Sequence, residues 1–138
     1  MHNEARTIDQ TLDSVFAQRY DGTISAIVCA HDCTDQTEDL IVQGMARYSS
    51  LSLISSSQKG RPAAWNRMRT AANTQYVCFA DGDVLLHPDA VRSLYEEMQK
   101  QRLLGAGALD IPLLEGTSFG TRLMAQPAGN KGSMVGRL

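Results

Sequence analysis

The sequence has no long apolar run and no excess of either charge. No stretch approaches the roughly 20 apolar residues of a transmembrane helix, and the first residues do not form a signal peptide. The 13 basic and 15 acidic side chains give a formal net charge of -2, whereas a nucleic-acid-binding domain usually carries a basic excess. We therefore expect no nucleic-acid partner and predict a cytoplasmic protein, with membrane association left open for a longer parent chain.

Cysteine is scarce. The three cysteines, Cys29, Cys33 and Cys78, are an odd number and do not form the pattern of a secreted disulfide scaffold. Cys29, His31 and Cys33 alternate onto one face of a predicted strand, which raises zinc as an alternative. Closed zinc sites usually add a second cysteine pair, and only Cys78 remains, so we interpret Cys29 and Cys78 as small core residues.

Apolar runs and amphipathic segments alternate along the chain. We predict strands over residues 23–30, 51–55, 75–80 and 103–109, with helices before, between and after them. The run at 76–80 is apolar on both faces, which is typical of a strand covered by helices on both sides. The sequence therefore predicts an α/β fold with a mostly parallel sheet of three to four strands. We expect a single domain over residues 1–138, with a core at 1–110 and an irregular glycine-rich tail at 111–138.

Helix boundaries and buried faces follow from capping residues and from the 3.6-residue period. Asp35 is expected to cap the second helix, with Glu38 completing a capping box, and Pro62 and Pro88 mark the starts of the third and fourth. The apolar residues expected to face the core are Ile8, Leu12, Val15 and Phe16 in the first helix, Ile41, Met45 and Tyr48 in the second, Ala64, Met68 and Ala71 in the third, and Val91, Leu94, Tyr95 and Met98 in the fourth.

The segment Asp81-Gly82-Asp83 directly follows the most apolar predicted strand. Residues i and i+2 of an extended segment point the same way, so both carboxylates can converge on one divalent cation. Mg²⁺ and Mn²⁺ favour carboxylate and phosphate oxygens, and ligands of parallel sheets bind at the carboxyl ends of strands. An Asp-Gly pair taken alone more often marks a tight turn.

Two further groups of polar residues lie at predicted strand ends or helix starts. Lys59-Gly60-Arg61-Pro62, followed by Asn66, combines two cations with a helix amino terminus, an arrangement that suits an anion; the alternative is a solvated basic loop. His31 and Asp32 follow another strand and can reach a base or ribose, or can equally be turn residues.

Read in order, these segments resemble a family 2 glycosyltransferase with its nucleotide-binding, Rossmann-like GT-A fold. The resemblance covers about residues 2–100 and rests on the order of five blocks. The matching segments are His2-Asn3-Glu4, Thr11 to Val15, Val28 to Thr37, Lys59-Gly60-Arg61 with Asn66, and Val77 to Ala90, which includes the family's Asp-x-Asp motif. In the third block, Ala30 and His31 replace two aspartates of the usual pattern, which puts the identity of the recognised base in doubt.

The resemblance implies metal-dependent, inverting transfer of a sugar from a nucleotide diphosphate sugar to an acceptor hydroxyl. It implies Asp83, with Asp81, as ligands of Mg²⁺ or Mn²⁺. The residues that it implies for binding the nucleotide sugar are Asn3, Glu4, His31, Asp32, Lys59, Arg61, Asn66 and Asp81.

The resemblance also implies features that this sequence does not contain. The family's first strand would precede Met1, and we expect the general base beyond Leu138, because Asp110 and Glu115 are interpreted as surface acids. An absent first strand leaves an open sheet edge, which predicts a homo-oligomer. The leading hypothesis is thus a glycosyltransferase of which this chain carries only the part of the active site that binds the sugar donor. Two alternatives to it stay open. One is a non-catalytic nucleotide-binding module that works with a partner chain, and the other is a phosphotransfer or phosphatase domain.

Overall fold

The computed structural model describes residues 1–57 and 60–107. These residues form two compact units, one comprising residues 1–17 and 22–86, the other comprising residues 18–21 and the described residues from 87 onward. The elements are α1 (Ile8–Phe16), β1 (Ala26–His31), α2 (Thr37–Arg47), β2 (Leu51–Ser56), α3 (Arg61–Ala71) and α4 (Ala90–Gln101). The predicted single domain with a glycine-rich tail stays a prediction, since residues 108–138 lie outside the described part.

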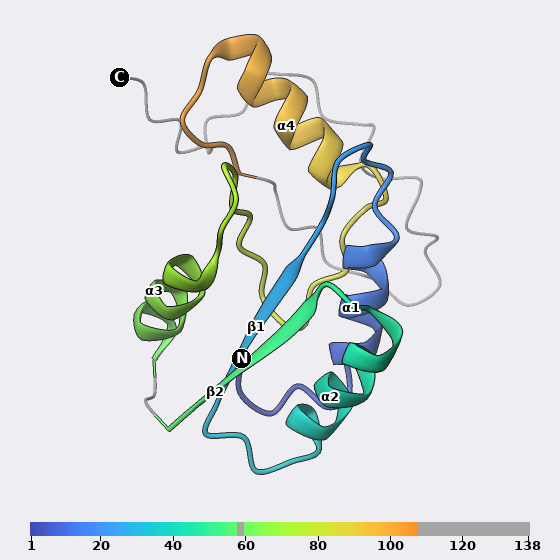
Figure 1. Cartoon of the computed structure of the whole chain (residues 1–138), viewed down its shortest axis with the longest axis vertical. Helices are drawn as coiled ribbons and strands as arrows, with labels where there is room; N and C mark the ends of the chain where they lie inside the picture. Colours follow the sequence, from blue (N-terminus) through green and yellow to red (C-terminus); the bar gives the residue numbers. More distant parts are fainter. Residues whose placement is uncertain (58–59, 108–138) are drawn as a thin grey trace. The chain divides into compact units, whose positions relative to one another are not determined.

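The first unit is built on β1 and β2, which pair in parallel. Ala26 lies opposite Leu51 at one end of the pair, and His31 lies opposite Ser56 at the other. Figure 1 shows α1 and α2 on one side of the two strands and α3 on the other. The predicted α/β fold is confirmed, but the sheet in the described residues has two strands instead of three or four.

The core of this unit lies between the sheet and the helices α1 and α2. Ile8 and Leu12 of α1 are 0% and 2% exposed, and Ile41 of α2 is 0% exposed, as their helical spacing predicts. They pack with Val28, Ala30 and Leu51 of the strands. Of the other residues predicted for these faces, Phe16 and Tyr48 stack with ring centroids 4.1 Å apart.

Gly44, and not Met45, continues the buried face of α2. Met45 is 41% exposed, so its predicted core position is wrong. A Cβ atom at Gly44 would lie 3.1 Å from Leu12 Cδ1 and 3.2 Å from Leu51 Cδ2. The helix therefore approaches α1 and β2 so closely at this position that only a residue without a side chain fits with ease.

Asp35 bonds to the first residue of α2, but the N-cap residue is Gln36 and the predicted capping box is not formed. Its carboxylate accepts hydrogen bonds from the backbone nitrogen of Thr37 at 3.0 Å and from the Thr37 hydroxyl at 2.5 Å. The Glu38 carboxylate instead accepts a hydrogen bond from the Ser55 hydroxyl at 2.7 Å, so the predicted box is wrong. A side chain on the neighbouring strand competes successfully for this carboxylate, which the local sequence does not show.

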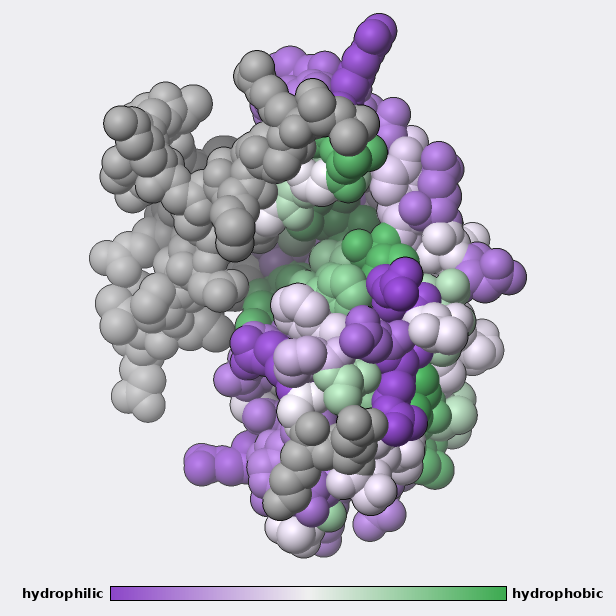
Figure 2. Space-filling model, turned by 90° about the vertical axis from the view of Figure 1, so that its left-hand side faces the viewer, coloured by the Kyte–Doolittle hydropathy of each residue, from purple (hydrophilic) through white to green (hydrophobic). Residues whose placement is uncertain are grey.

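The predicted strand at 75–80 is not formed. No described segment pairs with it, and a strand needs a neighbour to satisfy its backbone N–H and C=O groups. The large apolar side chains of this run stay about half exposed, at 42% for Tyr76, 46% for Val77 and 41% for Phe79. Cys78 is also exposed, which corrects its predicted core position, whereas Cys29 is buried as predicted. Figure 2 shows apolar surface on the side of the molecule that carries α3.

Helix α3 begins at Arg61, with Pro62 in its first turn as predicted. Ala64 is 5% exposed and faces the core, whereas Ala71 is exposed, so the expected buried face ends early. Gly60, just before the helix, has a φ of 111°, a conformation that residues with a Cβ rarely adopt.

The second unit pairs α4 with the short segment 18–21. Gln18 holds the start of the helix: its side-chain nitrogen donates to the carbonyl of His87 at 2.8 Å, and its side-chain oxygen accepts from the amide of Val91 at 2.9 Å. The rings of Tyr20 and Tyr95 meet edge to face at 5.7 Å. The apolar residues expected to face the core in α4 are only half-buried. No strand is present at 103–107, and the rest of that predicted strand lies outside the described residues.

Candidate functional site

The segment Asp81-Gly82-Asp83 forms a turn held by hydroxyl groups of α1 and of the residue before it. The buried carbonyl of Gly82 accepts a hydrogen bond from Thr11 Oγ1 at 2.9 Å and another from Thr7 Oγ1 at 3.3 Å. Gly82 is buried while Asp81 and Asp83 are exposed. The turn is therefore fixed through its backbone, and its two carboxylates stay available to solvent and ligands.

Met1 joins this turn to the carboxyl end of β1. The Met1 ammonium donates to the carbonyl of Cys29 at 2.7 Å, and the Met1 carbonyl accepts from the amide of His31 at 3.0 Å. A Cβ atom at Gly82 would lie only 2.7 Å from Met1 Cε and 3.3 Å from Glu4 Cγ. Figure 1 shows the amino terminus beside the arrowhead of β1. The acidic turn thus lies at the strand end where parallel sheets bind their ligands.

Asn3 and Glu4 hold the loop that follows β1. The Asn3 side chain donates to Thr34 Oγ1 at 3.0 Å and accepts from the Thr34 amide at 2.8 Å. The backbone nitrogen of Glu4 donates to Thr37 Oγ1 at 2.8 Å. The Asn3 side chain therefore hydrogen-bonds to other residues of the protein, and Asn3 and Glu4 together fix the loop beside the acidic turn.

His31 and Asp32 lie at the carboxyl end of β1. The His31 ring stacks on the His2 ring with centroids 5.9 Å apart and planes 9° apart, and His2 Nδ1 donates to the His31 carbonyl at 3.2 Å. Asp32 has a φ of 53°, a left-handed conformation that aspartate tolerates better than most residues. The strand ends here in a sharp change of direction, and both residues lie at the same sheet edge as Met1.

Arg61 is brought directly to the acidic turn. Its guanidinium lies 3.6 Å from a carboxylate oxygen of Asp81, and both side chains are at least half exposed. A pair this exposed contributes little stability, so either partner can exchange the other for a ligand at low cost. Lys59, the other predicted cation, lies outside the described residues.

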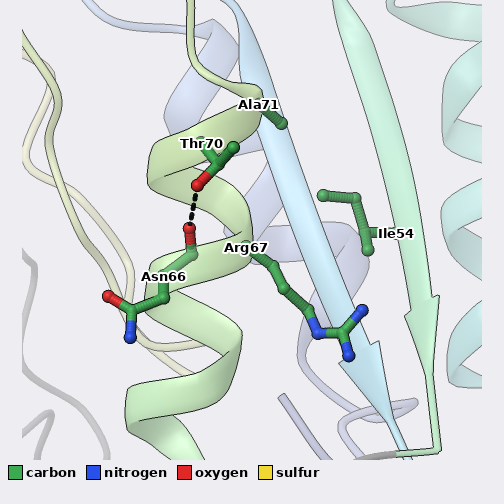
Figure 3. A pocket seen from close by; sticks show the side chains of 5 residues that line it. All are labelled: Ile54, Asn66, Arg67, Thr70 and Ala71. Atoms are coloured by element: carbon green, nitrogen blue, oxygen red, sulfur yellow. Dashed lines mark hydrogen bonds between the residues drawn. The ribbon is translucent and has the colours of Figure 1, made fainter.

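Asn66 occupies a different place from the acidic turn. With Ile54, Arg67, Thr70 and Ala71 it lines an open pocket of about 450 Å³ between α3 and β2. Figure 3 shows its amide pointing away from Ile54, while the Arg67 side chain extends across the pocket. The Asn66 backbone carbonyl accepts a hydrogen bond from the Thr70 hydroxyl at 2.9 Å. The structure therefore shows no direct link between Asn66 and the acidic turn among the described residues.

The donor set of the acidic turn suits a cation that is shared with a phosphate. In the described part of the chain, no group of three or more His, Cys, Asp or Glu side chains is arranged to hold a metal ion. Asp81 and Asp83 supply carboxylate oxygens from two residues only. Mg²⁺ is commonly bound in this way, through one or two carboxylates together with substrate phosphates, so the residues fit a nucleotide-bound cation.

The loop beside the turn carries an acidic group, Asp35, whose pKa is lowered. Hydrogen bonding by the Thr37 side chain, supported by the amides of Thr37 and Ala5, holds the pKa of Asp35 below its usual value of 3.8. A carboxylate that accepts these bonds is stabilised in its charged form. Asp35 is therefore a structural anion, tying the amino-terminal segment to the start of α2.

Thr7, Thr11 and Ser14 were not predicted as residues of this site, although Thr11 and Ser14 lie in one of the blocks that carry the resemblance. Ser14 Oγ accepts a hydrogen bond from the amide of Leu86 at 3.1 Å, so three hydroxyls at positions i, i+4 and i+7 hold the segment 82–86. Residues at this spacing share one helix face. A row of small hydroxyl residues beside the apolar face of Ile8 and Leu12 is the signal that could have revealed them.

The fold and this geometry define an α/β protein with an acidic turn, exposed to solvent, at the carboxyl end of a parallel strand. Residues 1–118 match the sequence model described as Glycosyl transferase family 2. Because the match covers most of the 138 residues, the chain belongs to glycosyl transferase family 2. No curated protein matches the sequence.

Family membership confirms the glycosyltransferase-like character that the sequence predicts. Among the described residues, no helix combines the length and the apolar character needed to cross a membrane. The predicted site residues, the metal and the oligomeric state stay predictions.

Proposed function

We propose that the chain binds a nucleotide diphosphate sugar together with Mg²⁺ or Mn²⁺, and serves inverting transfer of the sugar to an acceptor hydroxyl. The observation that carries this proposal is the Asp81-Gly82-Asp83 turn. Its backbone is fixed by Thr7 and Thr11, and its carboxylates are exposed at the carboxyl end of β1. Membership of glycosyl transferase family 2 supports the reaction class.

Asp81 and Asp83 would hold the cation, whose role when bound is to neutralise charge on the diphosphate leaving group. Asp81 already has a cationic neighbour, since Arg61 lies 3.6 Å away. A diphosphate offers Arg61 a second anionic partner, and the free amides of the first turn of α3 add to this attraction. We propose that Arg61 and Lys59 contact the diphosphate.

The base and ribose would lie beside the loop after β1. His31 and Asp32 end the strand, and Asn3 and Glu4 hold the loop against the amino-terminal segment. Asp32 is exposed, so a ribose or a base bound beside this loop can reach its side chain. Asn66 would take part in donor binding only through a rearrangement of α3, because it lies on the pocket between α3 and β2.

Calorimetry of the chain with UDP, GDP and CDP, each with and without Mn²⁺, tests this proposal. The two carboxylates alone should hold the cation weakly, because a small hard cation keeps its waters until phosphate oxygens join. The nucleotide and the cation should therefore bind cooperatively, each raising the affinity of the other by the same factor.

Two variants test whether Asp83 couples the binding of Mn²⁺ to the binding of the nucleotide. Asp83→Ala should abolish the effect of Mn²⁺ on nucleotide affinity. Asp39→Ala, which removes an exposed carboxylate from α2, should leave that effect unchanged. If no nucleotide binds, or if binding ignores both Mn²⁺ and Asp83, the proposed donor site is wrong.

A further inference from the structure

Two neighbouring contacts join helix α3 to the segment that leads into the acidic turn. The Arg61 guanidinium lies 3.6 Å from Asp81 Oδ2, and the Trp65 ring stacks on the Phe79 ring with centroids 4.9 Å apart and planes 23° apart. Arg61 and Trp65 are four residues apart and share one face of the helix, while Phe79 precedes Asp81 by two residues. The aromatic stack therefore holds the first turns of α3 beside the acidic turn and keeps Arg61 within reach of Asp81.

Arg61 lies where it opposes the binding of a metal ion to Asp81. A guanidinium and a divalent cation repel each other, and both are attracted to the same carboxylate. Binding of the cation by both aspartates therefore requires Arg61 to withdraw. Withdrawal is easy, because the Arg61 and Asp81 side chains are 67% and 50% exposed and water screens their attraction.

A diphosphate gives Arg61 another anion to bind when it leaves Asp81. If the cation or the nucleotide binds alone, each has to break the pair between Arg61 and Asp81 by itself. If both bind, the pair is broken once for the two ligands together. The ion pair therefore makes the two ligands bind cooperatively, in addition to any direct contact between the cation and the phosphate oxygens.

We propose that Arg61 competes with the cation for Asp81 in the free chain and moves to the diphosphate when the donor binds. This inference rests on the proposed function, in which Asp81 and Asp83 hold the cation. It adds a regulatory role to the contact of Arg61 with the diphosphate. Arg61 keeps the site from taking up a free cation, so the nucleotide binds first or together with the metal.

Binding of Mn²⁺ and of nucleotide to the full chain tests this competition. Electron paramagnetic resonance measures free Mn²⁺, and calorimetry uses whichever of UDP, GDP and CDP the wild-type chain binds most tightly. Arg61→Ala should raise the affinity for Mn²⁺ alone about two- to fivefold, the range that corresponds to the strength of an exposed ion pair. The factor by which the nucleotide raises the affinity for Mn²⁺ should fall by a similar amount.

Two control variants separate the competition from a general effect of charge. Arg61→Lys keeps a cation at this position and should retain most of the cooperativity. Arg69→Ala removes the same charge from the last turn of α3, at an exposed position, and should change neither the affinity for Mn²⁺ nor the cooperativity.

A second measurement is made in metal-free buffer. Asp81→Asn releases Arg61, so it should raise the affinity for the nucleotide more than Asp83→Asn, which removes the same charge from the same turn. In a chain that also carries Arg61→Ala, this difference should vanish, because no arginine is left to release. The comparison of the two aspartate variants leaves α3 unaltered. It therefore decides the question if Arg61→Ala changes the fluorescence of Trp65, the single tryptophan of the chain.

Two results would overturn the competition and leave the proposed donor site intact. One is cooperative binding of nucleotide and Mn²⁺ by the wild-type chain that Arg61→Ala does not change. The other is an equal effect of Asp81→Asn and Asp83→Asn on metal-free nucleotide affinity. If the wild-type chain binds no nucleotide, the proposed function and the competition are both wrong.

Discussion

The hydroxyl of Thr11 should be the main support of the acidic turn. Thr11 is 5% exposed, and its hydroxyl donates to the buried carbonyl of Gly82 at 2.9 Å. Thr7 is a poorer donor for the same carbonyl, because its single hydroxyl hydrogen has three acceptors, all at 3.3 Å. Thr11→Val keeps the shape of the side chain and removes the better bond. A buried group left unpaired costs about 1–3 kcal/mol, so we expect Thr11→Val to lower the free energy of unfolding by about that amount.

Thermal and urea unfolding measure this loss, and calorimetry measures its functional consequence. For a chain of 138 residues, about 1 kcal/mol corresponds to a fall in Tm of roughly 4 °C. The Mn²⁺-dependent gain in nucleotide affinity should fall as well, since the turn that carries Asp81 and Asp83 loses its anchor. Thr23→Val, at an exposed position outside any helix or strand, is the matched control and should change neither property. If Thr7→Val destabilises the chain more than Thr11→Val, or if both leave stability and affinity intact, the hydroxyls do not position the turn.

Two further substitutions test how the elements around the site are fixed. Asp35→Asn should destabilise the chain most at neutral pH. The bonded Asp35 carboxylate has a pKa held below 3.8 by Thr37, so its contribution is present above that pH and is lost as the pH falls through the lowered pKa. Urea unfolding of both forms between pH 3 and 7 should show the difference shrinking toward pH 3, and a constant difference would contradict this role. Gly44→Val should cost about 1–3 kcal/mol by crowding Leu12 and Leu51, whereas Gly44→Ala should be close to neutral because its gain in helix propensity offsets the tighter contact; equal unfolding free energies for the alanine and valine forms would refute the close packing.

The helices were predictable because their information is local. The helical spacing that places Ile8, Leu12 and Ile41 on buried faces can be seen within each short segment of sequence. The structure confirms that these three residues are buried. Met45 was wrongly predicted to be buried, because a hydropathy pattern does not identify a glycine at a close contact between helices. Gly44 is buried instead, since it has no side chain where α2 approaches α1 and β2.

The strand predicted at 75–80 is absent because a strand forms only when it pairs with a second segment. Its apolar pattern indicates which residues suit a sheet, but pairing depends on a neighbour elsewhere in the chain. The sequence predicted that Asp81-Gly82-Asp83 continues an extended segment, with a tight turn as the alternative, and the structure forms the turn, with both aspartates exposed. The sequence could not show that Thr7, Thr11 and Ser14 hold that turn, since hydroxyl residues on a helix are usually solvated and the contact spans about seventy residues of chain.

These contacts change which element controls the position of the carboxylates. In a regular sheet, the ladder of the preceding strand would fix residues at its end, but residues 75–80 have no ladder in the described structure. The turn is instead held from α1 by hydroxyls, from the amino terminus by the tight contact of Met1 with Gly82, and from α3 by the exposed Arg61 pair. The exposed ion pair contributes least, and the buried hydroxyl bond contributes most. Donor affinity should therefore depend more on the buried face of α1, which the protein itself covers, than on the apolar run that leads into the turn.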